Sequence, residues 1–151
     1  MTRTLFSPAH RLLMPLLAAT GVACAKSGTE PNLVDISGHW TFVEQFSDII
    51  HQVTCADTGT YEMFQSANGF TGAYAQRGAC HGPGINADNA DSGTVSEGRV
   101  LGRTIKFKAP NCSYDGQTPL DRTDRLDGHV ICTIGDATIT YNFSGSWSAV
   151  R

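Results

Sequence analysis

The feature that most constrains this sequence is the absence of a helical period after Ile36. No window of 11 residues has apolar side chains at positions i, i+3, i+4 and i+7, whereas short stretches alternate between apolar and polar residues. Alternate side chains of a β-strand point to opposite faces of a sheet. The chain is therefore predicted to be all-β, with Trp40, Phe42 and Phe46 on one face of a first strand over Gly38–Phe46.

Turn residues divide the rest of the sequence into predicted strands. Asn68-Gly69 and Gly102-Arg103 predict hairpin turns, and the Gly/Asn/Asp-rich segment 78–92 is predicted to be the longest loop. The strands expected after the first cover residues 60–65, 70–74, 94–101, 104–108, 112–118, 125–133 and 137–150. Six to eight strands with no helix to cover them favour an antiparallel up-and-down meander that closes, or nearly closes, into a barrel. A β-sandwich is the alternative.

The first 23 residues resemble a secretory signal peptide. A basic start precedes an apolar core over residues 12–19, and small residues follow. Residues 20–24, Thr-Gly-Val-Ala-Cys, resemble the bacterial lipobox, although that family usually has leucine in place of Gly21. The resemblance implies that Cys24 is lipidated, becomes the mature N-terminus and anchors the protein at the outer membrane or cell surface. Cleavage by an ordinary signal peptidase would instead give a periplasmic or secreted protein.

Three segments follow from this interpretation. Residues 1–23 form the signal peptide, residues 24–35 form a lipidated N-terminus with a flexible tether, and residues 36–151 form the barrel domain. Without Arg3 and Arg11 the 11 Lys and Arg become nine against 14 Asp and Glu, a net charge of −5. Such a chain has no basic excess for nucleic acid, so the expected partners are the membrane, through the lipid, and a small ligand or an envelope protein.

Five cysteines in an exported chain leave one unpaired, and lipid on Cys24 removes the odd one. A turn at Asn68-Gly69 would place Cys80 opposite Asp57, two positions from Cys55, and a bulge near Thr58-Gly59 would close the gap. A hairpin in which Thr118 faces Arg125 would place Cys112 opposite Ile131, beside Cys132. These registers predict the disulfides Cys55–Cys80 and Cys112–Cys132.

Residues at the two ends of the domain carry a second resemblance. Gly38-His39-Trp40 lies on the first predicted strand, and Arg151 follows Trp147 at the end of the last one. This arrangement is similar to the calycin pattern of lipocalins and avidins. The resemblance implies that Trp40 closes one end of the barrel, with the basic residue of the final strand across its ring in a cation–π contact. Gly38, Trp40, Trp147 and Arg151 are therefore the expected closure residues of a monomeric barrel.

The sequence lacks residue patterns for catalysis or for metal binding. The histidines are scattered, and neither a Cys-x-x-Cys nor a Gly-x-Ser-x-Gly motif occurs. The Asn/Asp cluster over residues 86–91 is interrupted by Ala90, where an alternating calcium ligand would be needed. We therefore expect no enzyme activity, no metal and no cofactor.

Aromatic residues at alternating positions supply the lining that barrel ligand sites use. The expected ligand contacts are Tyr61, Phe70, Tyr74 and Tyr141, with residues 78–92 at the mouth. The sequence favours a barrel that binds a small apolar ligand or a peptide. An inhibitor of an envelope protease or lysozyme, which would use its acidic outer surface against a basic enzyme, and a structural envelope protein are the alternatives.

Overall fold

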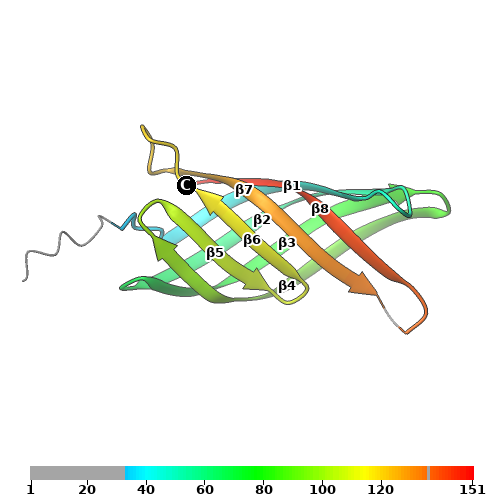
Figure 1. Ribbon diagram of the computed structural model, residues 1–151, viewed down its shortest axis with the longest axis horizontal. Helices are drawn as coiled ribbons and strands as arrows, with labels where there is room; N and C mark the ends of the chain where they lie inside the picture. The colour runs from blue at the N-terminus through cyan, green and yellow to red at the C-terminus, as the bar shows by residue number, and fades with distance from the viewer. Residues whose placement is uncertain (1–32, 136) are drawn as a thin grey trace, which may run out of the picture.

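The computed structural model describes residues 33–135 and 137–151, which form eight antiparallel strands (Figure 1). The signal peptide, Cys24 and most of the predicted tether lie outside the described residues. The strands are β1 (Gly38–Asp48), β2 (Val53–Ser66), β3 (Gly69–Gly82), β4 (Ile85–Leu101), β5 (Thr104–Ala109), β6 (Cys112–Gln117), β7 (Arg125–Gly135) and β8 (Thr140–Val150). No helix within the described ranges is long and apolar enough to cross a membrane.

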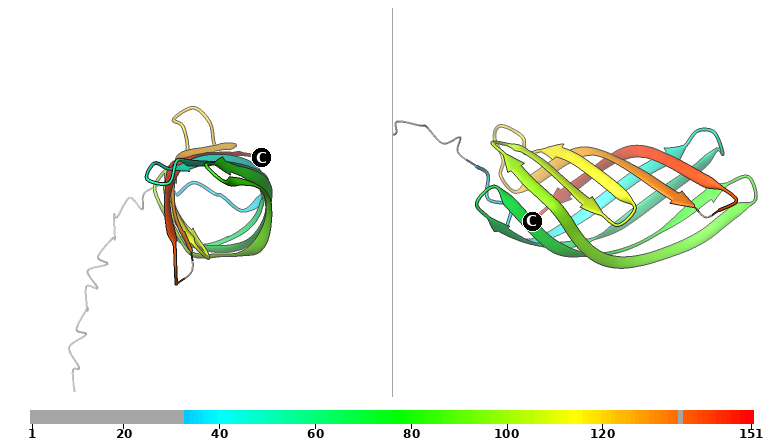
Figure 2. Two further views of the ribbon diagram at one scale, coloured as in Figure 1. Left: turned by 90° about the vertical axis from the view of Figure 1, so that its right-hand side faces the viewer. Right: turned by 60° about the horizontal axis from the view of Figure 1, so that its bottom comes forward.

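Each strand pairs with its neighbour in the sequence, and β1 also pairs with β8, so the sheet forms a closed barrel (Figure 2). The seam runs from the pair Thr41 and Val150 to the pair Ser47 and Ser144. Gly145 lies on this seam, where a Cβ would collide with the backbone of Phe46. The predicted all-β, up-and-down, closed barrel is confirmed, and the β-sandwich alternative is wrong.

The chain segment before β1 closes one end of the barrel. Val34 and Ile36 are buried in the core, and Trp40 is completely buried beside them. The indole Nε1 of Trp40 donates to the carbonyl oxygen of Ile36 at 2.8 Å. The guanidinium carbon of Arg151 lies 4.9 Å from the centre of the Trp40 ring, so the structure contains the cation–π contact that the sequence predicted.

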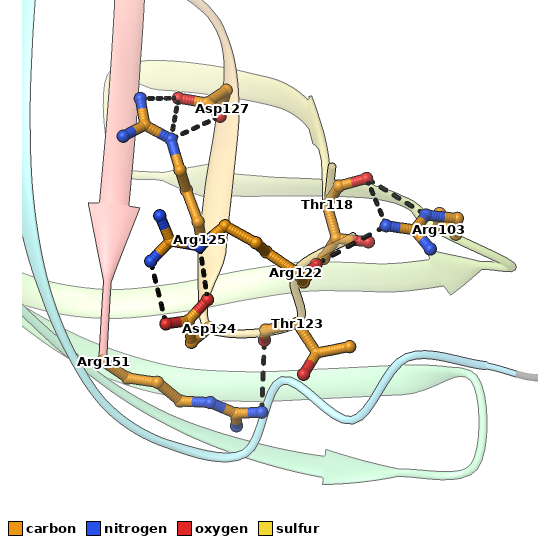
Figure 3. A network of polar contacts seen from close by, with 8 residues as sticks. All are labelled: Arg103, Thr118, Arg122, Thr123, Asp124, Arg125, Asp127 and Arg151. Atoms are coloured by element: carbon orange, nitrogen blue, oxygen red, sulfur yellow. Dashed lines mark hydrogen bonds and ion pairs between the residues drawn. The ribbon is translucent and has the colours of Figure 1, made fainter. Parts of the chain in front are cut away.

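Two arginines tie the surrounding loops to this closed end (Figure 3). Arg103 donates from Nε and Nη2 to the carbonyl oxygen of Thr118, at 3.1 Å and 3.0 Å. Arg151 donates from Nη2 to the carbonyl oxygen of Thr123 at 3.2 Å and from Nη1 to that of Ser37 at 3.0 Å. Arg151 therefore joins the last strand, the β6–β7 loop and the segment before β1.

The barrel domain includes residues before Ile36. Val34 packs in the hydrophobic core, and its backbone N–H donates to the carbonyl oxygen of Gly102 at 3.1 Å. The predicted tether, 24–35, is therefore too long at its C-terminal end. The sequence did not predict this contact, because Val34 and Ile36 alone are too short a pattern to indicate a buried segment.

Both predicted disulfides are present, although the hairpin registers used to predict them were wrong. Cys55 pairs directly with Cys80 and is bonded to it. Ser66 pairs with Gly69, so the turn consists of Ala67, which has a positive φ of 53°, and Asn68, instead of Asn68-Gly69. The predicted bulge near Thr58-Gly59 is therefore absent from the β2–β3 pairing.

The second disulfide required a smaller correction. Cys112 pairs directly with Cys132, to which it is bonded, instead of lying opposite Ile131. The register of the β6–β7 hairpin differs by one residue from the prediction. Both bonds thus join residues that face each other on neighbouring strands of the barrel.

The segment 78–92, predicted to be a loop, is a long hairpin. Residues up to Gly82 belong to β3, and the residues from Ile85 belong to β4, with the register continuous from Gly82↔Ile85 to Gly72↔Val95. Gly84 supplies the positive φ of 76° that the turn requires. Backbone pairing between the two strands outweighs the weak strand preference of glycine, asparagine and aspartate.

Candidate functional site

Unequal strand lengths leave part of β4 without a neighbouring strand on its second edge. β4 has 17 residues, whereas β5 and β6 have six each. β5 pairs only with Ser96 to Leu101 of β4, so within the described residues the stretch from Ile85 to Val95 is paired with β3 alone. Inward-facing Asp91 is exposed here and Asn89 is partly exposed. We call the interior bordered by residues 76–82 of β3 and 85–93 of β4 the open half.

A row of inward-facing residues crosses the wall of the open half from β1 to β4. The register pairs Glu44 with Asp57, Asp57 with Gly78, and Gly78 with Asn89. Glu44 and Asp57 are buried despite their carboxyl groups. A Cβ at Gly78 would collide with Oδ1 of Asp57, so the glycine makes the space that this carboxylate occupies. We call Glu44, Asp57 and Asn89 the inner polar row.

Glu44 is the most perturbed carboxyl group of this row. Burial raises the pKa of Glu44 to about 7, against the lowering effect of a hydrogen bond from Tyr114, and the neighbouring charge of Asp57 raises it further. The hydroxyl of Tyr114 donates to Oε2 of Glu44 at 3.1 Å. Two acids directly opposite each other on antiparallel strands repel, so the Glu44–Asp57 pair is unfavourable for folding.

Asp57 is incompletely hydrogen-bonded. Gln76 Nε2 and Asn89 Nδ2 both donate to Oδ2 of Asp57 over a long 3.4 Å. Burial raises the pKa of Asp57, and the Asn89 hydrogen bond lowers it. Oδ1 of Asp57 and Oδ1 of Asn89 are buried and receive no hydrogen bond from the described residues. The inner polar row therefore presents two buried acceptor oxygens without donors.

An aromatic layer lies against the inner polar row. Trp147 pairs with Glu44 across the barrel seam, and its ring centre lies 5.7 Å from that of Tyr114. The indole covers Gly116 and Gly128, where a Cβ would collide with it. The layer consists of Phe42, Tyr61, Phe107, Tyr114 and Trp147. These rings fill the middle of the barrel and form the apolar floor of the open half.

Tyr74 and Asp91 extend this polar lining toward the unpaired stretch of β4. The hydroxyl of Tyr74 donates to Oδ2 of Asp91 at 2.6 Å. Burial, this hydrogen bond and the charge of Asp91 raise the pKa of Tyr74, so the phenol keeps its proton at neutral pH. Asp91 therefore adds a third acid to the wall that carries Glu44 and Asp57.

The four expected ligand contacts do not form one site. Tyr61 lies in the aromatic layer, and Phe70 packs toward the closed end with its ring centre 5.8 Å from that of Phe107. Tyr74 borders the open half through Asp91. Tyr141 packs elsewhere, stacked on Phe143. The inward orientation of these residues agrees with the alternation, but only Tyr61 and Tyr74 lie near the inner polar row.

The closure residues also divide between two levels of the barrel. Trp40 and Arg151 lie together at the closed end, and Gly38, with a φ of 114°, begins β1 there. Trp147 lies deeper, in the aromatic layer, because its register places it opposite Glu44. Trp147 therefore belongs to the seam and to the floor of the open half.

The sequence analysis missed Glu44, Asp57 and Asn89. The alternation that placed Trp40, Phe42 and Phe46 on one face also places Glu44 there, and Asp57 follows Cys55 at the same spacing. An acid at an inward position of a predicted barrel was therefore a readable signal. Asn89 had no such signal, since it belongs to the Asn/Asp cluster of residues 86–91, whose composition predicts a loop.

The outer face has a shallow groove across β3, β2, β1, β8 and β7, on the other side of the wall that carries Glu44, Asp57 and Trp147, and these three residues also contribute to its lining. It encloses about 680 Å³ and is lined by small side chains, including Ala56, Ser146 and Ser148. Arg77 lies at one side, and Arg125, which is paired with Asp127 at 2.6 Å, lies at the other. This groove is a surface on which a partner could bind.

No family model and no curated protein matches the sequence. Among solved structures, the S-type phycobiliprotein lyase of Guillardia theta is similar, with a TM-score of 0.46 and 9% sequence identity. The similarity covers 77% of this chain and 88% of that chain.

Replacing Glu44 by glutamine should stabilise the protein above neutral pH. The pKa of Glu44 rises from 4.5 to about 7 on folding, so the folded state holds a proton that the unfolded state has lost between these values. Stability therefore falls as the pH rises through this range. The variant should be more stable by up to about 3 kcal/mol near pH 8 and unchanged near pH 4, as measured by urea unfolding.

The matched control for this measurement is Glu62→Gln. Glu62 is exposed on the outer face of β2 and, among the residues that the structure describes, forms an ion pair only with exposed His39, at 3.1 Å. Exposed ion pairs contribute little to stability, so this control should show a small effect at both pH values. An equal gain for Glu44→Gln near pH 4 and near pH 8 would contradict the assigned titration.

Proposed function

We propose that this protein is an exported, lipid-anchored envelope barrel of the calycin type, which binds a small ligand in its open half. The inner polar row is the main support for this proposal. In it, buried carboxyl and amide oxygens that receive no hydrogen bond from the described residues lie beside the aromatic layer. Ligand sites combine apolar walls with a few convergent polar groups, and carboxyl groups with raised pKa values gather at such sites. The ligand would place its apolar part, or the apolar side chain of a peptide, against the aromatic layer.

The neutral fluorescent probe N-phenyl-1-naphthylamine tests this proposal. We expect a saturable rise in its fluorescence as it enters the open half. Ala87→Trp should weaken its binding by about tenfold or more, because Ala87 is exposed and pairs with Cys80 on the inward-facing side of the β3–β4 hairpin. Ala90→Trp, on the outward-facing side of β4 opposite Arg77, is the matched control and should leave binding unchanged.

Two results would overturn the proposal. The first is the absence of saturable binding to the folded wild-type protein. The second is equal weakening by Ala87→Trp and Ala90→Trp, which would place the probe outside the barrel.

The outer groove supports a second candidate function, inhibition of an envelope protease or lysozyme. This groove has a width of five strands and lies on a chain with acidic net charge. The net acidic charge of the chain would steer a basic enzyme toward the molecule, although the groove itself carries Arg77 and the Arg125–Asp127 ion pair. Inhibition of a basic enzyme that is lost in Val43→Arg, on the groove wall, and kept in Ala87→Trp would favour this function.

The proposed lipid anchor predicts that Cys24→Ser changes the N-terminal processing of the protein and its partition into detergent. The wild-type protein should partition into detergent, with the mass of a lipidated N-terminal cysteine. The Cys24→Ser protein should remain unprocessed or become soluble. An unmodified mature N-terminus several residues away from Cys24 in the wild-type protein would contradict lipidation.

A further inference from the structure

We infer that the ligand is a small organic cation, a protonated amine with an attached apolar group, whose ammonium is held by Asp57, Glu44 and Asn89. This inference rests on the proposed function and names the chemical class of its ligand. The apolar group would lie against Tyr114 and Trp147.

The charges of the open half give the first argument. Glu44, Asp57 and Asp91 all face the interior, and none takes part in the ion pairs that join residues of 33–135 and 137–151. Buried carboxylates are costly unless a cation or several hydrogen bonds compensate them. A ligand cation would supply the missing opposite charge.

The hydrogen bonds give the second argument, which concerns the donors that the ligand must supply. Asp57 is almost completely buried, and no donor from residues 33–135 or 137–151 reaches its Oδ1 or the Oδ1 of Asn89. Asn89 already donates through Nδ2 to the other oxygen of Asp57. The site therefore lacks donors and not acceptors. An ammonium group carries three donors and no acceptor, which complements these two oxygens and the carboxylate of Glu44.

The spacing of the acids distinguishes an organic cation from a metal ion. Within the part of the chain that the structure describes, no group of three His, Cys, Asp or Glu side chains is close enough to hold a metal. Glu44 already accepts a hydrogen bond from Tyr114, and Asp91 one from Tyr74. A calcium ion takes six to eight oxygen ligands at about 2.3–2.6 Å, whereas an ammonium group needs only three acceptors at the longer distances of hydrogen bonds.

The aromatic layer gives the third argument. Trp147 and Tyr114 lie next to Glu44, and the two ring centres are 5.7 Å apart in an edge-to-face arrangement. Aromatic faces attract cations and pack against apolar groups. An arylalkylamine would therefore meet carboxylates with one end and rings with the other.

Three probes of similar size separate charge from shape: 2-phenylethylamine, neutral 2-phenylethanol and anionic phenylacetate. Binding to the folded protein near pH 8 is followed by the amide NMR signals of Gly78 and Asn89. At this pH Glu44, with a pKa of about 7, is ionised. We expect 2-phenylethylamine to bind about tenfold or more tightly than 2-phenylethanol, and phenylacetate to bind weakest.

Isosteric variants identify the charges responsible. Glu44→Gln and Asp57→Asn keep an acceptor oxygen for Tyr114 and Asn89, so both should fold, which an unchanged amide spectrum verifies. In the double variant the affinities for 2-phenylethylamine and 2-phenylethanol should differ by less than about twofold, because the affinity for the amine falls. Glu62→Gln should keep the wild-type preference.

Each contrary result has a distinct meaning. Equal binding of 2-phenylethylamine and 2-phenylethanol to the wild-type protein would overturn the inference. So would an amine preference that survives in the double variant, or the failure of all three probes while N-phenyl-1-naphthylamine binds. In these cases the proposed ligand site stands. Failure of N-phenyl-1-naphthylamine as well would overturn both.

Discussion

Replacing Trp40 by alanine lowers the free energy of unfolding by about 3–5 kcal/mol. Trp40 is completely buried and connects β1 with two other parts of the closed end. Its indole donates to the carbonyl oxygen of Ile36 in the segment before β1, and its ring lies under Arg151 at the end of the chain. Truncation removes the largest side chain at this end and leaves a cavity where the segment before β1 crosses the barrel. Urea unfolding followed by circular dichroism measures the loss.

Two controls separate this packing effect from others. Val43→Ala changes an outward-facing residue of the same strand that is 55% exposed, and it should cost less than about 0.5 kcal/mol. Arg151→Ala removes the cation–π contact but leaves Trp40 in place, so its effect should be smaller than that of the Trp40 truncation. A Trp40→Ala protein of near wild-type stability would show that the closed end is not part of the cooperative core.

The alternation of side chains predicted the barrel because it records the face of each strand, which is a property of the backbone itself. Trp40, Phe42 and Phe46 face inward as expected. The same rule applies to Glu44, yet an acid among core residues was not taken as a signal. The sequence predicts a ligand site lined by aromatic residues. In the structure, buried acids lie beside these aromatic residues.

Turn chemistry was less reliable than alternation. Asn68-Gly69 is a strong hairpin signal, but the turn uses Ala67-Asn68, with Ala67 in the left-handed region. Pairing of Cys55 with Cys80 and of Tyr61 with Tyr74 in this register outweighs the local preference of Gly69. The position of Asn89 depends on the same long-range pairing, and no local pattern could indicate it.

Unequal strand length was only partly visible in the sequence. The short strand expected over residues 104–108 agrees with β5, which ends just before Pro110. However, the other half of the opening is the continuation of β4 through Asn86, Asp88 and Asp91, residue types that are rare in strands. The open half exists because β4 continues where β5 and β6 have ended, and this follows only from the pairing of β3 with β4.

Removing both disulfides, as Cys→Ala at all four positions, should lower the free energy of unfolding by about 6 kcal/mol. The two bonds close loops with sequence separations of 25 and 20 residues, for which chain entropy predicts roughly 3 kcal/mol each. Small domains are stable by only about 5–15 kcal/mol, so the variant should be marginally folded at best.

The single pairs distinguish the roles of the two bonds. Cys55 lies two residues before Asp57 on β2, and Cys80 lies two residues after Gly78 on β3. This bond therefore also holds together the two strands that position Asp57. Cys112 and Cys132 join β6 to β7 at the end of the short β5–β6 hairpin. Cys55→Ala/Cys80→Ala should therefore weaken ligand binding more than Cys112→Ala/Cys132→Ala does, at a similar loss of stability in urea unfolding. If both pairs weaken binding equally, the effect of the Cys55–Cys80 bond is global stability alone and not the placement of Asp57.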